Sequence, residues 1–119
     1  MKPLAATLIF AFGVFHALPV LPWLTQPRDP SAPDDQLILR VPQWARVGWF
    51  LASLIVVAGA VVLAVDGWVG LAIAGVAMAD VCTMAVANGF WMKGRPTISH
   101  HATRIAIAIA LLALGAFAL

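Results

Sequence analysis

The sequence contains no glutamate and no tyrosine, has one cysteine, and carries few charges: 10% of its 119 residues are Asp, Glu, Lys or Arg. A single cysteine, Cys82, excludes an intramolecular disulfide and a zinc site built from several thiolates. So few charges also exclude an ordinary soluble catalytic domain. The net charge of +2 comes from basic residues beside the expected helix ends. Membrane orientation explains that placement better than a phosphate-binding surface, so nucleic acid is not an expected partner.

Apolar residues make up 63% of the chain, and its mean hydropathy is +0.99, so we expect a lipid bilayer around it. At about 20 residues per membrane crossing, its length allows four helices and one domain. We therefore predict an all-α fold, a polytopic membrane protein built as an antiparallel bundle of four transmembrane helices. The spans are expected at about 3–24, 45–65, 68–91 and 100–119. The first run is longer than a signal-peptide core and lacks a small-x-small cleavage site, so we expect it to be retained.

Three polar interruptions separate the apolar runs. Residues 25–43 hold four prolines among charged side chains, which predicts a stiffened loop whose second half, 37–41, lies along the membrane surface. Asp66 and Gly67 predict a turn so tight that the flanking helices must be antiparallel neighbours. Residues 92–99 predict a short basic loop.

The basic residues predict the orientation of the bundle. Lys2 stands alone on one side, whereas the opposite side receives Arg28, Arg40, Arg46, Lys93, Arg95 and Arg104. Because positive loops are retained in the cytoplasm, we expect both termini outside a bacterial inner (plasma) membrane. Tryptophans fall at the expected span ends, as amphipathic rings do at the headgroup level: Trp23, Trp44, Trp49, Trp68 and Trp91.

Small residues recur every three or four positions in the last two spans. Such stripes allow helix backbones to approach closely inside a membrane. They are Gly70, Ala74 and Gly75 in the third span, and Ala102, Ala106, Ala110 and Ala113 in the fourth. A tight monomeric bundle, a homo-oligomer and a larger membrane complex are all compatible with this pattern.

Asp80 is the polar residue that the sequence places deepest. It lies about 16 Å from Trp91 along a helix, close to the bilayer centre, where an unpaired carboxylate is costly. Helical spacing puts Thr83 and Asn88 on the same face. We expect this face to turn inward, so that Asp80 is protonated, paired or hydrated.

His16 is expected at a depth within about 4 Å of Asp80, so that a carboxylate–imidazole pair is geometrically allowed. The alternative is that the imidazole bonds a carbonyl freed by Pro19, or Ser53, as a contact between helices. Arg104 offers a rival partner, although an arginine near a span end is expected to snorkel to the surface. The candidate polar pocket therefore comprises His16, Asp80, Thr83, Asn88 and Arg104.

His100 and His101 are adjacent, and their side chains project about 100° apart on a helix. This geometry is poor for sharing one metal ion, and no H-x-x-x-H spacing is present, so we predict no metal site. Their ordinary role is a solvated junction between loop and helix. The sequence contains no motif that identifies a cofactor.

Three functions fit these residues. The first is an accessory subunit or binding module of unknown ligand, which is not an enzyme. The second is a proton-linked small-molecule carrier that uses a cytoplasm-facing polar pocket around Asp80. The third is a membrane-embedded enzyme acting on a lipid or quinone, with Asp80 and His16 as the acid–base couple.

Overall fold

Four long helices form the fold in the computed structural model, which describes residues 1–94 and 97–119. They are α1 (Lys2–Ala17), α2 (Gln43–Val65), α3 (Gly67–Lys93) and α4 (Ile98–Phe117). Two 3₁₀ helices, η1 (Leu21–Trp23) and η2 (Asp34–Arg40), lie between α1 and α2, and the described residues contain no strand. The prediction of an all-helical fold with four helices long and apolar enough to cross a membrane is confirmed. Arg95 of the expected basic loop lies outside the described residues.

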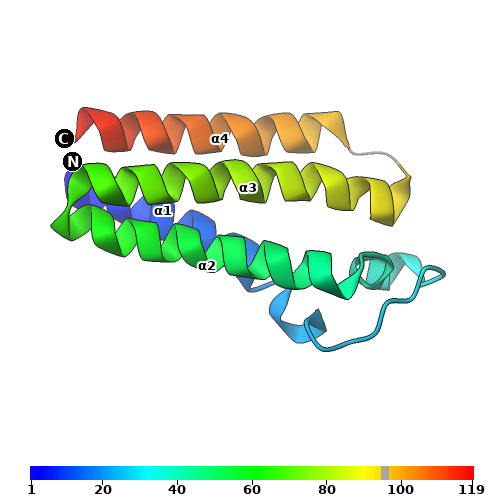
Figure 1. Ribbon diagram of the computed structural model, residues 1–119. Coiled ribbons are helices and arrows are strands. Elements are labelled where there is room, and N and C mark those ends of the chain that lie inside the picture. The colour runs from blue at the N-terminus through cyan, green and yellow to red at the C-terminus, as the bar shows by residue number, and fades with distance from the viewer. Residues whose placement is uncertain (95–96) are drawn as a thin grey trace.

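The helices form an antiparallel ring (Figure 1). Both termini and the turn between α2 and α3 lie at one end, while the long loop after α1, the end of α3 and the start of α4 lie at the other. In the ring α1 packs on α2, α2 on α3, α3 on α4, and α4 on α1. The α1/α4 face and the α2/α3 face therefore lie on opposite sides of the bundle.

The span expected at 3–24 corresponds to α1 and η1 together, and it is not one continuous helix. Proline has no N–H to donate to the carbonyl four residues back, so the α-helical ladder cannot continue through Pro19. The chain tightens there, and the Val20 amide bonds the Ala17 carbonyl at 3.2 Å. The bounds of α2, α3 and α4 lie within two residues of those expected.

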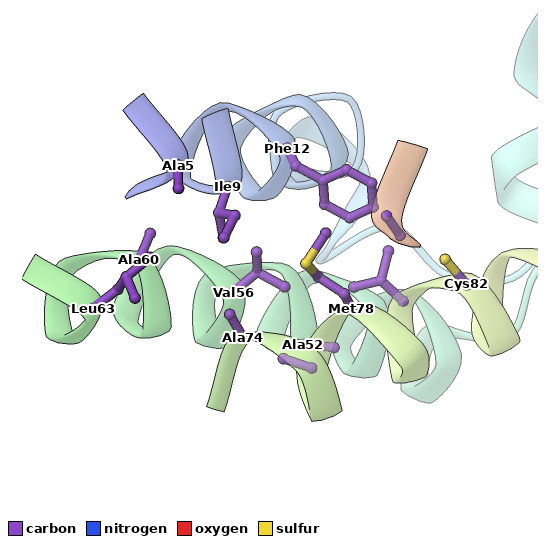
Figure 2. Packing of buried hydrophobic residues seen from close by; sticks show 13 residues of the cluster. Ala5, Ile9, Phe12, Ala52, Val56, Ala60, Leu63, Ala74, Met78 and Cys82 are labelled. Carbon is purple, nitrogen blue, oxygen red and sulfur yellow. The ribbon is translucent and has the colours of Figure 1, made fainter. Parts of the chain in front are cut away.

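The core of the bundle is built by α1, α2 and α3. In Figure 2, Ile9 and Phe12 of α1 lie over Val56 of α2 and Met78 of α3. Backbones approach so closely here that a Cβ at Gly70 would lie 2.1 Å from the Leu63 nitrogen on α2. This confirms the close packing expected at Gly70 and Ala74, which is fully buried.

Helix α4 is attached more loosely. Its buried residues are Ala108 and Gly115, whereas α3 buries nine. The four alanines of the stripe in the fourth span do not pack inside the bundle, because Ala102, Ala106, Ala110 and Ala113 are exposed, so contact with a second copy or a larger complex stays a prediction. Gly75 was expected to allow close approach, but a Cβ there would meet Leu112 only at 3.7 Å, an ordinary contact. Helix α4 therefore contributes little to the buried core.

Arginines fasten the long loop to the helix ends. Arg46 is fully buried, and its guanidinium donates to the carbonyls of Val41, Trp23 and Gln26. Arg40 donates to the Ala32 carbonyl, from Nη2 at 2.7 Å, and from Nη1 at 2.9 Å to the Met92 carbonyl at the end of α3. In addition, η2 packs on α3. Two of the arginines that we counted for orientation therefore also hold the loop in place.

Candidate functional site

Arg104 of α4 and His16 of α1 meet where these two helices face each other. Arg104 Nε donates to His16 Nε2 at 3.0 Å, although 88 positions separate the two residues. The same guanidinium reaches back along its own helix, with Nη1 2.8 Å from His101 Nδ1 and Nη2 3.1 Å from His100 Nε2. One cation is thus surrounded by three imidazole nitrogens. We call these four residues the arginine–histidine cluster.

The hydrogen bonds fix the protonation of His16. Its Nδ1 lies 2.8 Å from the Phe12 carbonyl, which can only accept, so Nδ1 carries the proton. Arginine can only donate, so Nε2 must present a lone pair to Arg104. His16 is therefore neutral in this arrangement, in a single tautomer. A second proton on the ring would break the contact with Arg104.

The same reasoning applies to His100 and His101, whose ring nitrogens must also accept from Arg104. A guanidinium has five N–H groups, and three are used here, which leaves two without a bond among the described residues. No carboxylate lies within ion-pairing distance of Arg104 in the described part of the chain. The cluster is therefore a positive charge with donors to spare.

A groove between α1 and α4 ends at this cluster. Its volume is about 510 Å³, within the usual range for small-molecule sites. The polar end is formed by His16, His100, Thr103 and Arg104, and the remainder is apolar and includes Leu8, Ala11, Ile107 and Leu111. From Leu8 to His16 the groove runs about 12 Å along α1. It is therefore amphipathic along its length, with the positive charge at the loop end of the bundle.

The structure brings together two of the five residues expected in the polar pocket, His16 and Arg104. Asp80 is exposed on the opposite face, in a groove between α2 and α3, and does not pair with His16. The expected inward turn of its face is wrong for Asp80 and for Thr83, which is also exposed. The Thr83 hydroxyl donates to the Ala79 carbonyl of its own helix at 2.8 Å.

Asn88 is the remaining member, and it is buried, 1% exposed, inside the bundle. Its Nδ2 has no hydrogen-bond partner among the described residues, and the same holds for Trp49 Nε1 on α2. The expected contact between Ser53 and His16 is also absent, because the Ser53 hydroxyl donates to the Trp49 carbonyl at 2.8 Å. Asn88 therefore lines neither groove.

Sequence reasoning left Thr103 and His100 out of the pocket. One signal could have found His100 and His101, because residues three and four positions apart on a helix are neighbours, which places both beside Arg104. The described residues contain no group of His, Cys, Asp and Glu side chains that could hold a metal ion. The three imidazoles surround the guanidinium instead.

No family model, curated protein or solved structure matches this chain.

Proposed function

We propose that this chain is a multi-pass membrane protein of the bacterial inner membrane that acts as a binding module, with both termini outside. Its ligand is a single-chain amphiphile with an anionic oxygen headgroup. The headgroup binds the arginine–histidine cluster, and the apolar chain lies in the α1/α4 groove. The observation that carries this proposal is Arg104, a cation with two unused N–H groups at the end of an apolar groove.

The preference for an anion follows from the cluster itself. Guanidinium groups bind carboxylates and phosphates through parallel N–H bonds, and charge-assisted bonds are about twice as strong as neutral ones. The neutral imidazoles hold the guanidinium in place without cancelling its charge. Arg104 lies six residues into α4, about 9 Å along the helix. The headgroup would therefore sit near the cytoplasmic interface, while the chain extends toward the membrane interior.

Two alternatives receive less support from the geometry. The carrier and the enzyme both require Asp80 and His16 to act in one site. These residues line grooves on opposite faces of the bundle. A binding module needs only the α1/α4 groove, which is why we prefer it.

The test compares ligands that share a tail and differ in the headgroup. Dodecanoic acid and dodecyl phosphate should both bind the purified protein in neutral phosphatidylcholine nanodiscs, whereas dodecanol and inorganic phosphate should bind at least tenfold more weakly. Arg104→Gln should reduce anion affinity about tenfold or more, since a charge-assisted bond contributes about 1.5 kcal/mol or more. Equal binding of dodecanoic acid and dodecanol would contradict the proposal.

A matched pair of variants tests the groove. Ile107 and Ile109 are both exposed on α4, but only Ile107 lines the groove. Ile107→Phe should weaken dodecanoic acid binding, and Ile109→Phe should leave it unchanged. Equal losses in both variants would mean that the tail does not lie between α1 and α4.

The orientation has its own test. Cysteines at the exposed Ser31 and Thr97 should react only with a reagent applied from the cytoplasm, and a cysteine at Val65, 86% exposed, only with one applied from outside. A Cβ at Gly67 would displace the end of the Leu119 side chain, so Val65 is the simpler position for the probe. Labelling of Ser31→Cys from outside would show that the orientation is the opposite of the one proposed.

A further inference from the structure

The α2/α3 face carries a second groove, of about 720 Å³. Its lining includes Ala52 and Ile55 of α2, with Ala72, Val76 and Asp80 of α3. Asp80 is the one ionisable residue among those that line it. The groove lies apart from the arginine–histidine cluster, although Ala52 and Ala77 in its lining also belong to the core, and the proposed function leaves it unused.

The carboxylate of Asp80 lacks a partner. Asp80 is exposed, and the described residues provide no hydrogen bond or ion pair to it. It lies 13 residues before Lys93, about 20 Å along a helix of 27 residues, and so near the middle of the membrane. Ionised carboxylates are rare at that depth and are almost always paired or in contact with water. A positive charge supplied from outside the chain would stabilise an ionised Asp80 at this depth.

The shape of the groove limits what can supply that charge. From Ala72 to Asp80 it extends about 12 Å, with the carboxylate at one end and apolar side chains along the rest. A transmembrane helix contacts its partner along a much greater length, about 30 Å of hydrocarbon. A symmetric second copy would place two Asp80 carboxylates against each other, and like charges repel. A small ligand fits this groove better than either.

We propose that the α2/α3 groove binds a lipophilic monovalent cation, such as a hydrophobic amine or onium ion, with its charge at Asp80 and its apolar body along Ala72 and Val76. The volume lies in the range of small-molecule sites, which are mostly apolar with a few polar groups that set orientation. The ligand reaches the groove from the bilayer. This site goes beyond the anionic-amphiphile function and shares with it only the placement in a membrane.

The experiment uses two ions of the same shape and opposite charge. Radiolabelled tetraphenylphosphonium is bound to the full chain in neutral phosphatidylcholine nanodiscs, with binding to empty discs subtracted, and tetraphenylborate serves as the matched anion. Asp80→Asn should weaken tetraphenylphosphonium binding at least tenfold, Asp80→Glu should retain it, and tetraphenylborate should show no dependence on Asp80. Arg104→Gln should leave tetraphenylphosphonium binding intact, which separates this proposal from the α1/α4 function.

Matched variants on α3 complete the test. Thr83 lies one turn from Asp80 on the same exposed side but outside the groove, so Thr83→Val should bind like the wild type. Ala72→Phe should fill the groove and weaken binding, whereas Ala79→Phe, at an exposed position outside the groove, should not. Wild-type binding by Asp80→Asn would overturn the proposal. A dimer detected by native mass spectrometry would also overturn it if the dimer bound no tetraphenylphosphonium and Asp80→Asn dissociated it. That result would show that a second copy covers the α2/α3 face.

Discussion

On the α1/α4 face, Arg104 is surrounded by three imidazole nitrogens, whereas on the α2/α3 face Asp80 has no partner among the described residues. The helices behind these faces differ as well. Backbones of α2 and α3 touch at Gly70, while α4 is attached through two buried residues. The first site has its partners and lies beside a loosely packed helix, while the second lacks a partner and lies between two closely packed helices. A polar side chain in such a bundle can thus find its hydrogen-bond partners within the chain, as Arg104 does, or lack them there, as Asp80 does.

The largest loss of stability is expected for Arg46, which holds the long loop, and a much smaller loss for Arg104, which we propose binds a ligand. Arg46→Gln would leave the carbonyls of Val41, Trp23 and Gln26 without their guanidinium donor, so we expect a loss of about 3 kcal/mol or more in the free energy of unfolding. Arg104→Gln should cost only about 1 kcal/mol, because water can replace its bonds to the exposed end of the cluster. Unfolding in mixed micelles, followed by helical circular dichroism, measures both. Equal losses would mean that Arg104 holds the fold rather than a ligand.

The next prediction compares the contact between α2 and α3 with the contact between α3 and α4. Gly70→Ala pushes a Cβ into the backbone of α2 and should destabilise the protein by about 1–3 kcal/mol. Gly75→Ala lies on the side of α3 that faces Leu112 of α4, where there is room. Its effect should be neutral or stabilising by up to about 1 kcal/mol, since alanine favours a helix over glycine. The same unfolding assay measures both variants. Similar losses in the free energy of unfolding would mean that α3 packs as closely on α4 as on α2.

The smallest effect concerns Asp80. Asn keeps hydrogen-bonding capacity and removes the charge, so Asp80→Asn should change the free energy of unfolding by less than about 0.6 kcal/mol, the average for a membrane side-chain hydrogen bond, or should stabilise the protein. A loss above about 2 kcal/mol in the same micelles would show that the carboxylate supports the fold, and would remove the contrast with Arg46.

Much of the fold could be predicted from the sequence, because long apolar runs separated by proline and charge predict membrane-spanning helices directly. The break at Pro19 was visible as a proline but not as the end of α1, since a short run of 3₁₀ turns keeps the span long enough. The roles of Arg40 and Arg46 could not be predicted, because their acceptors are backbone carbonyls, which leave no mark in the sequence.

The site was predicted only in part, for a different reason. Depth along a helix can be counted, so His16 and Asp80 could be placed at one level and Arg104 named as a rival partner, and the structure pairs His16 with Arg104. Which way α3 faces could not, because it is apolar on all sides and lipid is as apolar as the bundle interior. The expectation that Asp80 points inward rested on cost alone, and the structure places it outside.

Together the two proposals require that the two faces bind ligands of opposite charge independently. The most direct measurement is a crossed binding experiment, in which dodecanoic acid and tetraphenylphosphonium are each titrated into wild type, Arg104→Gln and Asp80→Asn in the same neutral nanodiscs. We expect Arg104→Gln to weaken only dodecanoic acid binding, by about tenfold or more, and Asp80→Asn to weaken only tetraphenylphosphonium binding, by a similar factor. Loss of both ligands in one variant, or of neither in both, would contradict this expectation.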